Sequence, residues 1–383
     1  MDKPTVQDIF HRFYPAYLDQ YSPSPVQAKV AHNIMNCKTG AYGANVCVCE
    51  DCGFVQIHYN SCRNRCCPMC QAVPKEMWMD ARREDVLDAP YFHLVFTVPD
   101  ILNPVIYSNQ RLLYDALYHA ASSTISELTA DPKHLGAKVG YICILHTWGS
   151  EMNFHPHIHA ILLGGGLASN NQWKDNGENF FLPIRVISKV FRGKYLEELK
   201  RLWEEDKLVF HGTAEKFRNH YTFKELLDSC YGMDWIPHCK KTFNGAQTVI
   251  KYLGKYTHRI AVSNHRTVRM DDDTVTFLVK DYRNEGQWKE LTISGVEFVR
   301  RFLMHVPPRR FVRIRHYGLL CSRTKSQKLT LCRNLLGCKK YLSKLRDMEM
   351  PEILEHLYGI KVCMCKACGG HLGKPQMRMP LRC

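Results

Sequence analysis

Hydrophobic positions near the N-terminus of this 383-residue chain recur every three or four residues, which predicts an amphipathic helix. These positions are Val6, Ile9, Phe10, Phe13, Tyr14 and Tyr17. A Ser-Pro-Ser-Pro break at 22–25 precedes a second predicted helix over 26–35. A β-rich run follows at 91–99, and a long helical region with one apolar stripe is predicted over about 102–130.

The middle of the chain predicts an antiparallel hairpin. Strands are expected over 139–146 and 157–163, and a helix over 245–257. A strand pair is expected at 274–280 and 287–293, followed by a helix over 294–304. Strands with interposed helices around a hairpin predict an α+β fold, in which a central antiparallel sheet has flanking helices.

Three histidines fall on the predicted hairpin. His157 and His159 are two residues apart, so both side chains leave the same face of a strand. His146 precedes His157 by eleven residues, and the turn would bring it back beside the pair. The three imidazoles could then hold one metal ion. A solvated strand with a chance His-x-His pair is the alternative.

Two tyrosines four residues apart, Tyr252 and Tyr256, share one face of the predicted helix over 245–257. A phenol has a pKa near 10, so it attacks only an electrophile that is already polarised. A divalent metal on a phosphodiester supplies that polarisation, and attack gives a 5′-phosphotyrosine and a free 3′-hydroxyl. Lys255 would stabilise phosphate charge or lie exposed. Gly254 is costly in a helix by about 1 kcal/mol, and a closely approaching DNA backbone would explain it.

The composition of the chain indicates a polyanionic partner and bound zinc. Lysine plus arginine is 52 against 37 acidic residues, a net charge of +15, which favours nucleic acid over a membrane surface. The segment MDKPTVQDIF is not a secretory leader, and there is no long apolar run, so a cytoplasmic protein with no membrane partner is expected. In a reducing compartment, the 18 cysteines indicate metal sites rather than disulfides.

The strongest cysteine pattern joins Cys49-x-x-Cys52 to Cys67-x-x-Cys70, with fourteen residues between the pairs. This spacing predicts one tetrahedral structural zinc. A second site could use the remaining residues, Cys37, Cys47, Cys62, Cys66 and His58. Near the C-terminus, Cys365-x-x-Cys368 is half a zinc knuckle, whose other ligands could be Cys363, Cys338 or Cys383. One, two or three zinc ions are therefore possible.

Basic residues surround the cysteine cluster and fill residues 300–317. Arg63 and Arg65 make the cysteine module a candidate nucleic-acid reader. Residues 300–317 hold six arginines and no acid, interleaved with aromatic residues, as a single-stranded DNA groove requires. The expected DNA-binding residues here are Arg309, Arg310, Arg313 and Arg315, and the aromatic residues are Phe302, Phe311 and Tyr317. A solvated edge with core aromatics is the alternative.

Three motifs together resemble the HUH two-tyrosine rolling-circle transposases of the insertion sequence 91 family. They are HPHIHAILLGGGL, NGAQTVIKYLGKYTHRIAVSNHR and NSCRNRCCPMCQ. The resemblance covers nearly the whole chain. It implies an HUH endonuclease domain, Mg²⁺ or Mn²⁺ at the histidines, and cleavage and rejoining of single-stranded DNA at transposon ends and target. It also places the protein in the bacterial cytoplasm at the nucleoid.

The resemblance leaves some assignments open. Position 66 is Cys where the family pattern has His. The offset of His146 is similar to the three-histidine sites of conjugative relaxases; Gln247 is the alternative third ligand, and Glu151 and His155 are weaker ones. No P-loop motif is present, so unwinding is expected from a host helicase or the replication machinery. The oligomeric state is not determined.

Four regions are expected: an N-terminal helical lead-in (1–36), a zinc-binding domain (37–87), an HUH nuclease domain with the tyrosine helix (88–270) and a basic C-terminal DNA-binding region with a possible zinc knuckle (271–383). Two other functions remain open. One is an HUH relaxase or plasmid replication initiator, and the other is a non-catalytic, zinc-dependent DNA-binding repressor.

Overall fold

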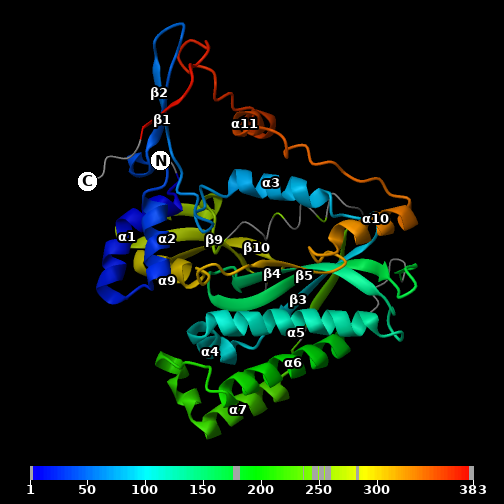
Figure 1. The fold of residues 1–383 in the computed structure, drawn as a ribbon. Helices are drawn as coiled ribbons and strands as arrows, with labels where there is room; N and C mark the ends of the chain where they lie inside the picture. The colour runs from blue at the N-terminus through cyan, green and yellow to red at the C-terminus, as the bar shows by residue number, and fades with distance from the viewer. Residues whose placement is uncertain are drawn as a thin grey trace.

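The computed structural model describes residues 3–175, 182–235, 237–243, 249, 254, 260–281 and 284–378. Every strand pairing among them is antiparallel, and helices flank the sheets (Figure 1). The predicted α+β fold with a central antiparallel sheet is therefore confirmed. None of the helices in this part of the chain is both long and apolar enough to cross a membrane.

The central sheet has six strands and is built around the histidine hairpin. Its order is β11-β4-β5-β3-β7, and β6 pairs with β5 outside this path. The bounds are β3 Tyr91–Thr97, β4 Lys138–Trp148, β5 Phe154–Leu167, β6 Trp173–Asp175, β7 His238–Phe243 and β11 Ile314–Gly318. β4 and β5 form the predicted hairpin, and β3 pairs with the other edge of β5.

Helices α4 to α7 lie on one side of this sheet. Their bounds are α4 Asn103–Ser108, α5 Gln110–Ala130, α6 Ile184–Glu204 and α7 His220–Gly232. Alternate strand residues, such as Phe96, Leu145 and Ile158, join the buried residues of α5 and α6 in one apolar core. In Figure 1, α5 lies below the sheet, with α6 and α7 below α5. Because the apolar residues face this core, the intervening residues of the same strands face the other side.

Asn109 divides the helical region predicted over about residues 102–130 into α4 and α5. Its backbone angles, φ −125° and ψ 38°, end α4 and precede α5. Its side-chain amide donates to the carbonyl oxygens of Val105 at 3.0 Å and Val209 at 2.7 Å, and its oxygen accepts from the Val209 N–H at 2.8 Å. The predicted helical region is confirmed, and it is divided into two α-helices because this buried asparagine bonds a distant backbone segment.

The N-terminal helices share a core with strands and a helix from late in the sequence. The bounds are α1 Val6–Gln20, α2 Pro25–Met35, β8 Thr267–Met270, β9 Thr274–Asp281, β10 Gln287–Ser294 and α9 Gly295–Met304. Capping boxes at Thr5 and Ser24 begin the two N-terminal helices. Phe10 and Phe302 meet edge to face, with ring centroids 5.2 Å apart, inside the common core.

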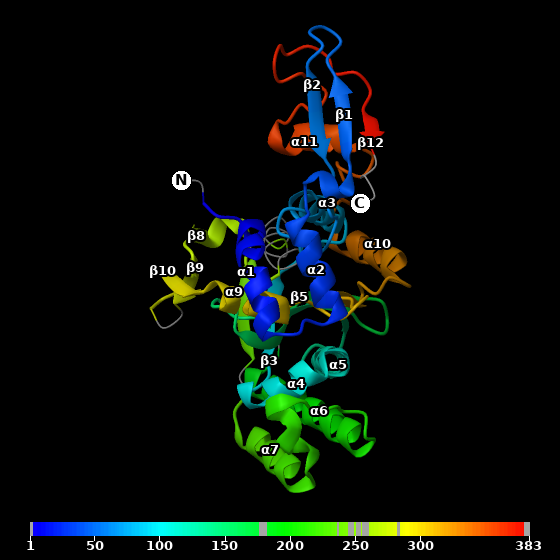
Figure 2. The ribbon, with the colours of Figure 1, turned by 90° about the vertical axis from the view of Figure 1, so that its left-hand side faces the viewer.

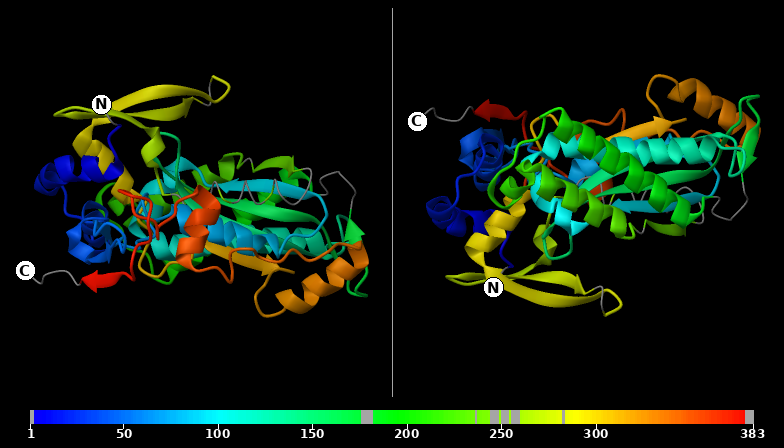
Figure 3. Two further views of the ribbon diagram at one scale, coloured as in Figure 1. Left: turned by 90° about the horizontal axis from the view of Figure 1, so that it is seen from above. Right: turned by 90° about the horizontal axis from the view of Figure 1, so that it is seen from below.

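The remaining elements lie above the histidine face of the sheet. They are α3 Ala72–Arg83, α10 Lys325–Leu336, α11 Met350–Tyr358, β1 Ala44–Val48, β2 Val55–Tyr59 and β12 Gln376–Arg378. Short 3-10 helices lie at Gly40–Tyr42, Asp100–Leu102, Gly212–Arg218 and Asn264–Arg266. The β1–β2 hairpin projects from the molecule with β12 and α11 beside it (Figure 2), and β8–β10 and α10 lie on opposite sides (Figure 3).

Candidate active site

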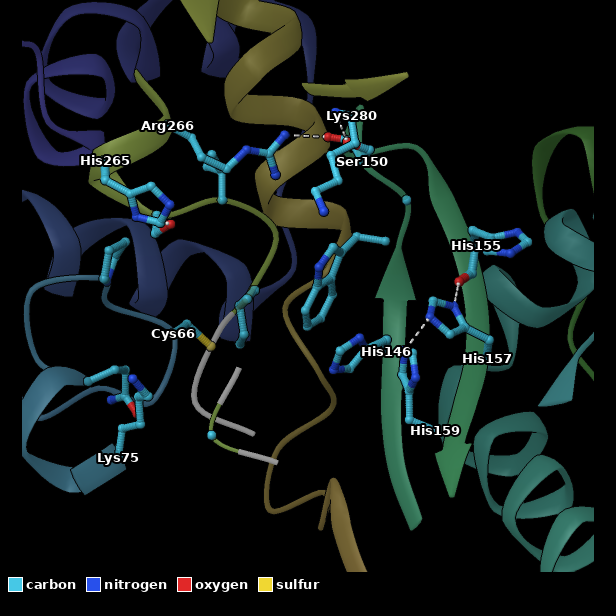
Figure 4. Close-up of a pocket in the computed structure, with 18 of the residues that line it drawn as sticks. Cys66, Lys75, His146, Ser150, His155, His157, His159, His265, Arg266 and Lys280 are labelled. Carbon is cyan, nitrogen blue, oxygen red and sulfur yellow. Dashed lines mark hydrogen bonds between the residues drawn. The ribbon is translucent and has the colours of Figure 1, made fainter. Parts of the chain in front are cut away.

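The hairpin brings the three predicted histidines onto one face of the central sheet. His146 on β4 pairs directly with His157 on β5, and Ile144 pairs with His159. Since strand side chains alternate, all three histidines point to the side away from α5. One ring nitrogen from each lies within 4.8 Å of the others (Figure 4). The described residues therefore contain the predicted three-histidine group.

Hydrogen bonds fix the ring orientations of the two β5 histidines. The Nδ1 of His157 lies 2.6 Å from the carbonyl oxygen of His155, so Nδ1 carries the proton and Nε2 keeps its lone pair. This Nε2 lies 3.0 Å from the Nε2 of His159. Adjacent ligands of an octahedral ion with bonds of about 2.1 Å are roughly 3 Å apart, so this pair fits a divalent metal.

A fourth histidine, which the sequence interpretation missed, supports this pair from β3. The Nε2 of His93 lies 2.8 Å from the Nδ1 of His159, and His93 is buried. When the Nε2 of His159 binds a metal, its Nδ1 carries the proton and donates to His93. The strand alternation that places Val95 opposite His159 also places His93 on this face. The sequence signal for His93 was weak, because it consisted of a single histidine within the predicted strand at 91–99.

Burial keeps His157 and His159 neutral. It lowers the pKa of His157 to about 3, with a further lowering from nearby His155. Burial also holds the pKa of His159 well below its usual value, and His146 and His157 add to this effect. Neutral imidazoles have a lone pair for a metal ion, whereas protonated ones do not. At neutral pH the site is therefore ready to bind a cation.

The histidines open into a cavity of about 870 Å³ between the sheet, the cysteine-rich module and residues 260–288. Arg65 and Lys75 line it from the cysteine-rich side, and Lys280 and Trp288 line it from the other. The Lys280 ammonium lies 5.3 Å from the centre of the Trp288 ring. The cavity has room for a nucleotide backbone and positive charge to attract one.

The predicted catalytic residues Tyr252, Lys255 and Tyr256, and the alternative ligand Gln247, lie outside the described residues. Two of their neighbours are described. Val249 is buried in the core under α3, and Gly254 lines the histidine cavity. A Cβ on Gly254 would lie 2.0 Å from the Sδ of Met79. Close packing against Met79 of α3 therefore gives a structural reason for glycine at this position, and the predicted approach of a DNA backbone stays a prediction.

The weaker candidates for the third ligand lie outside the histidine group. Glu151 is exposed, and the Nδ1 of His155 lies 3.2 Å from Asp100. His146 instead completes the group of described residues that can share one ion.

The cysteine pairs are grouped differently from the prediction. Cys67 and Cys70 meet Cys37 and Cys62, whereas Cys49 and Cys52 meet Cys365 and Cys368. The expectation that the two N-terminal pairs share one ion was wrong. Strand β2 lies between the two pairs in the sequence and is five residues, or roughly 17 Å, long. Cys49 and Cys52 therefore lie at the tip of the β1–β2 hairpin, whereas Cys67 and Cys70 lie beyond its base.

The group at the base of the hairpin, called the base cluster, consists of Cys37, Cys62, Cys67 and Cys70 and has the geometry of a tetrathiolate site. The Sγ of Cys70 lies 3.4 Å from that of Cys37 and 3.5 Å from that of Cys62. Cys66, expected as a ligand, is not in either cysteine group; it is buried against the histidine cavity, and burial raises the pKa of its thiol to about 11. Cys37 takes the place that Cys66 was expected to fill.

The arginines have different environments. Arg63, Arg309 and Arg310 are exposed. The exposed Arg65 donates to the carbonyl oxygens of Phe311 and Pro308, which ties the cysteine-rich module to that loop.

The two arginines at 313 and 315 lie closer to the core. Arg313 is partly buried, and Arg315 pairs with Asp115 and stacks over Tyr118 with 3.9 Å between its Cζ and the ring centre. Phe302 and Phe311 are buried, so their predicted role as stacking platforms was wrong. Phe311 packs in the core between the central sheet and α5, and Phe302 packs in the core of the N-terminal helices.

Comparisons with known proteins identify the class. A family model described as "Putative transposase" matches residues 140–328, and one described as "Transposase zinc-binding domain" matches residues 9–98. The chain is thus a transposase with an N-terminal zinc-binding domain. It is 40% identical to "Putative transposase y4qJ" of Sinorhizobium fredii, over 95% of this chain and 93% of that protein.

A second relative narrows the class. The "Transposase for insertion sequence element IS801" of Pseudomonas savastanoi pv. phaseolicola is 30% identical over 79% of this chain and 72% of its own length. The chain belongs to the insertion sequence 91 family of transposases. Among solved structures, the conjugative relaxase TrwC in complex with oriT DNA aligns at 14% identity over 43% of this chain and 71% of its own, with a TM-score of 0.25. The family assignment does not depend on that alignment.

Proposed function

We propose that this transposase cleaves and rejoins single-stranded DNA through 5′-phosphotyrosine intermediates, and so mobilises an insertion sequence by a rolling-circle mechanism. The observation that carries the proposal is the group of His146, His157 and His159, which opens into a cationic cavity also lined by Gly254. Gly254 lies between Tyr252 and Tyr256 in the sequence, which favours a nucleophile close to the histidines.

The three histidines would hold Mg²⁺ or Mn²⁺. Neutral rings and the 3.0 Å separation of the His157 and His159 nitrogens support this assignment. When bound, the ion would polarise the scissile phosphodiester and stabilise the leaving 3′-oxygen. The hydrogen bonds that His157 donates to the His155 carbonyl and His159 donates to His93 fix the ligand rings before DNA arrives, so little reorganisation is needed.

The chain's own residues would perform the transfer. A tyrosine oxygen attacks phosphorus, the P–O3′ bond breaks, and the phenol proton leaves to solvent. Lys255 stabilises the developing phosphate charge. The second tyrosine repeats the attack on another strand, and the released 3′-hydroxyl then attacks the phosphotyrosine to rejoin DNA. Positive side chains in the cavity, including Lys280, neutralise the backbone during these steps.

Zinc supports the DNA-binding part of the molecule in this proposal. Cys37, Cys62, Cys67 and Cys70 would bind a structural zinc with no open position, since four thiolates complete its coordination. The partners are single-stranded DNA at the transposon ends and target, and a host helicase or the replication machinery. The protein would work at the nucleoid in the bacterial cytoplasm.

The test uses single-stranded oligonucleotides that carry an element end, with Mn²⁺. A 3′-end label should move to the protein as a covalent adduct, while a 5′-end label should appear on a shorter strand with a free 3′-hydroxyl. The double variant Tyr252→Phe/Tyr256→Phe and the variant His157→Ala should give no adduct. Tyr221→Phe is the matched control, because Tyr221 is 76% exposed on α7 beneath the other face of the sheet.

Each single tyrosine variant should retain one attack and lose completed strand transfer. An adduct that persists in the double variant would contradict the proposal. If the wild type binds DNA but forms no adduct, the result would favour the non-catalytic DNA-binding repressor. An adduct formed equally on a plasmid origin and on an element end would favour the relaxase or initiator function.

A further inference from the structure

The second cysteine group joins the two ends of the chain. Cys49 and Cys52 lie in the turn between β1 and β2, and Cys365 and Cys368 lie in the tail after α11. The contacting pairs are separated by 319 and 313 positions in sequence. Their four sulfur atoms lie within 4.8 Å of one another.

The two halves of this group have the same backbone turn. Gly53 N–H donates to the Cys49 carbonyl at 3.1 Å, and Gly369 N–H donates to the Cys365 carbonyl at 2.9 Å. Both glycines directly follow a Cys-x-x-Cys and have a left-handed backbone, with φ 70° and 78°. Glycine adopts this conformation easily because it has no Cβ. The turns are therefore a matched pair of knuckles that face each other.

The sulfur separations fit a tetrahedral ion. The Sγ of Cys49 lies 3.5 Å from that of Cys368, and the Sγ of Cys52 lies 3.7 Å from that of Cys365. Four sulfurs at about 2.3 Å from zinc are roughly 3.8 Å apart, whereas a disulfide brings them to about 2.05 Å. All four cysteines are free thiols.

The sheet around the group has little core of its own. β12 pairs with β1, and Leu372 forms a bridge with Cys49. The buried cluster here contains Cys47, Cys49, Cys365 and Leu372, while Val55, Ile57 and Tyr59 on β2 are about half exposed. A unit with so small a core usually needs a metal to hold its fold.

We propose that Cys49, Cys52, Cys365 and Cys368 bind a second structural Zn²⁺, which clasps the C-terminal tail to the N-terminal hairpin. Four thiolates leave no position for substrate, so this ion is structural. The tail is also held on α3 by Asp80, which accepts hydrogen bonds from Tyr341 and Ser343 at 2.6 Å each. The clasp fixes the other end of the tail and thereby the hairpin that projects above α3 (Figure 1).

Zinc stoichiometry tests the site in the full-length protein. Titration of thiols with p-hydroxymercuribenzoate releases thiolate-bound zinc, which a metallochromic dye then measures. The wild type should release two equivalents and Cys365→Ser/Cys368→Ser one. Cys363→Ser is the matched control, because Cys363 is exposed and outside the group, and it should release two. Two equivalents from the double variant, or one from the wild type, would overturn the proposal.

Limited proteolysis tests whether the ion is shared. Cys49→Ser/Cys52→Ser changes only the N-terminal hairpin, yet trypsin cleavage at the exposed tail residues Lys361 and Lys366 should accelerate at least tenfold. The one zinc equivalent left in this variant reports that the base cluster remains folded. Unchanged cleavage of the tail would show that the two knuckles do not share an ion. Neither measurement depends on DNA cleavage, so failure of the nuclease proposal leaves this result interpretable.

Discussion

At the scale of single residues, the site depends on which nitrogen of each histidine carries a proton. His93 has no place in the HUH motif, yet its contact with His159 sets that histidine's orientation. Its neighbours on β3 pair with His159 and His157, so the same backbone register that aligns the ligands also aligns their support. The arrangement connects strand register directly to metal affinity.

We expect His93→Leu to weaken Mn²⁺ binding by about 10- to 100-fold, because the Nδ1 of His159 loses its partner. His93→Gln, which keeps a polar group there, should recover part of the affinity. The measurement is calorimetric titration of Mn²⁺ into metal-free protein. His211→Gln serves as the control, since His211 is exposed and far from the group in sequence. Equal affinities for wild type and His93→Leu would refute a positioning role.

At the scale of elements, α3 connects the central sheet to the tail. Its Met79 packs against Gly254 and the histidine side of the sheet, while Asp80 and Glu84 face residues 341–346. Burial tends to raise the pKa of Asp80, but hydrogen bonds from Ser343, Tyr341 and the Leu345 N–H hold it below its usual range. A buried carboxylate with this many donors is an anchor for the tail.

Asp80→Asn should destabilise the protein by roughly 1.5–3 kcal/mol, because the hydrogen bonds to a charged acceptor are lost or become mismatched. Urea unfolding followed by circular dichroism measures this change. The exposed Asp88, five residues past α3, gives the matched control Asp88→Asn, which should unfold as the wild type does. Trypsin cleavage in the tail should also rise in Asp80→Asn alone. If Asp80→Asn unfolds at the same urea concentration as the wild type, Asp80 does not anchor the tail.

At the scale of the whole molecule, His305 joins two hydrophobic cores. It follows α9, and its buried ring bonds to Thr147 on β4 at 3.1 Å and to the Met152 carbonyl at 3.0 Å. Burial lowers the pKa of His305 to about 4, and Arg300 contributes to the lowering. The junction between the N-terminal helical core and the central sheet therefore requires a neutral imidazole.

This junction predicts loss of stability in acid. Above the unfolded-state pKa of about 6.5, His305 is neutral in both states and has no effect. Between about 6.5 and 4, the unfolded chain binds a proton that the folded protein does not, so stability falls as pH falls. From pH 7 to pH 5 the wild type should lose about 2 kcal/mol more than His305→Gln. Urea midpoints at the two pH values, with saturating Mn²⁺ to keep the ligand histidines occupied, measure the difference; parallel curves would contradict it.

Sequence spacing by itself determined what lies on one element. The two-residue period put His157 and His159 on one face, the hairpin pattern returned His146, and each Cys-x-x-Cys-Gly gave a knuckle. Capping residues and periodicity also predicted α1, α2 and α9. The combined motifs indicated the family that the comparisons show.

Only tertiary structure decided which elements meet. It grouped Cys49 and Cys52 with Cys365 and Cys368 instead of Cys67 and Cys70. It also brought His93 to His159 and placed Phe302 and Phe311 in cores. A local pattern fixes the direction of a side chain relative to its own backbone. The partner across a gap depends on strand order and on how apolar faces from distant segments are buried together, and neither is encoded in residue spacing.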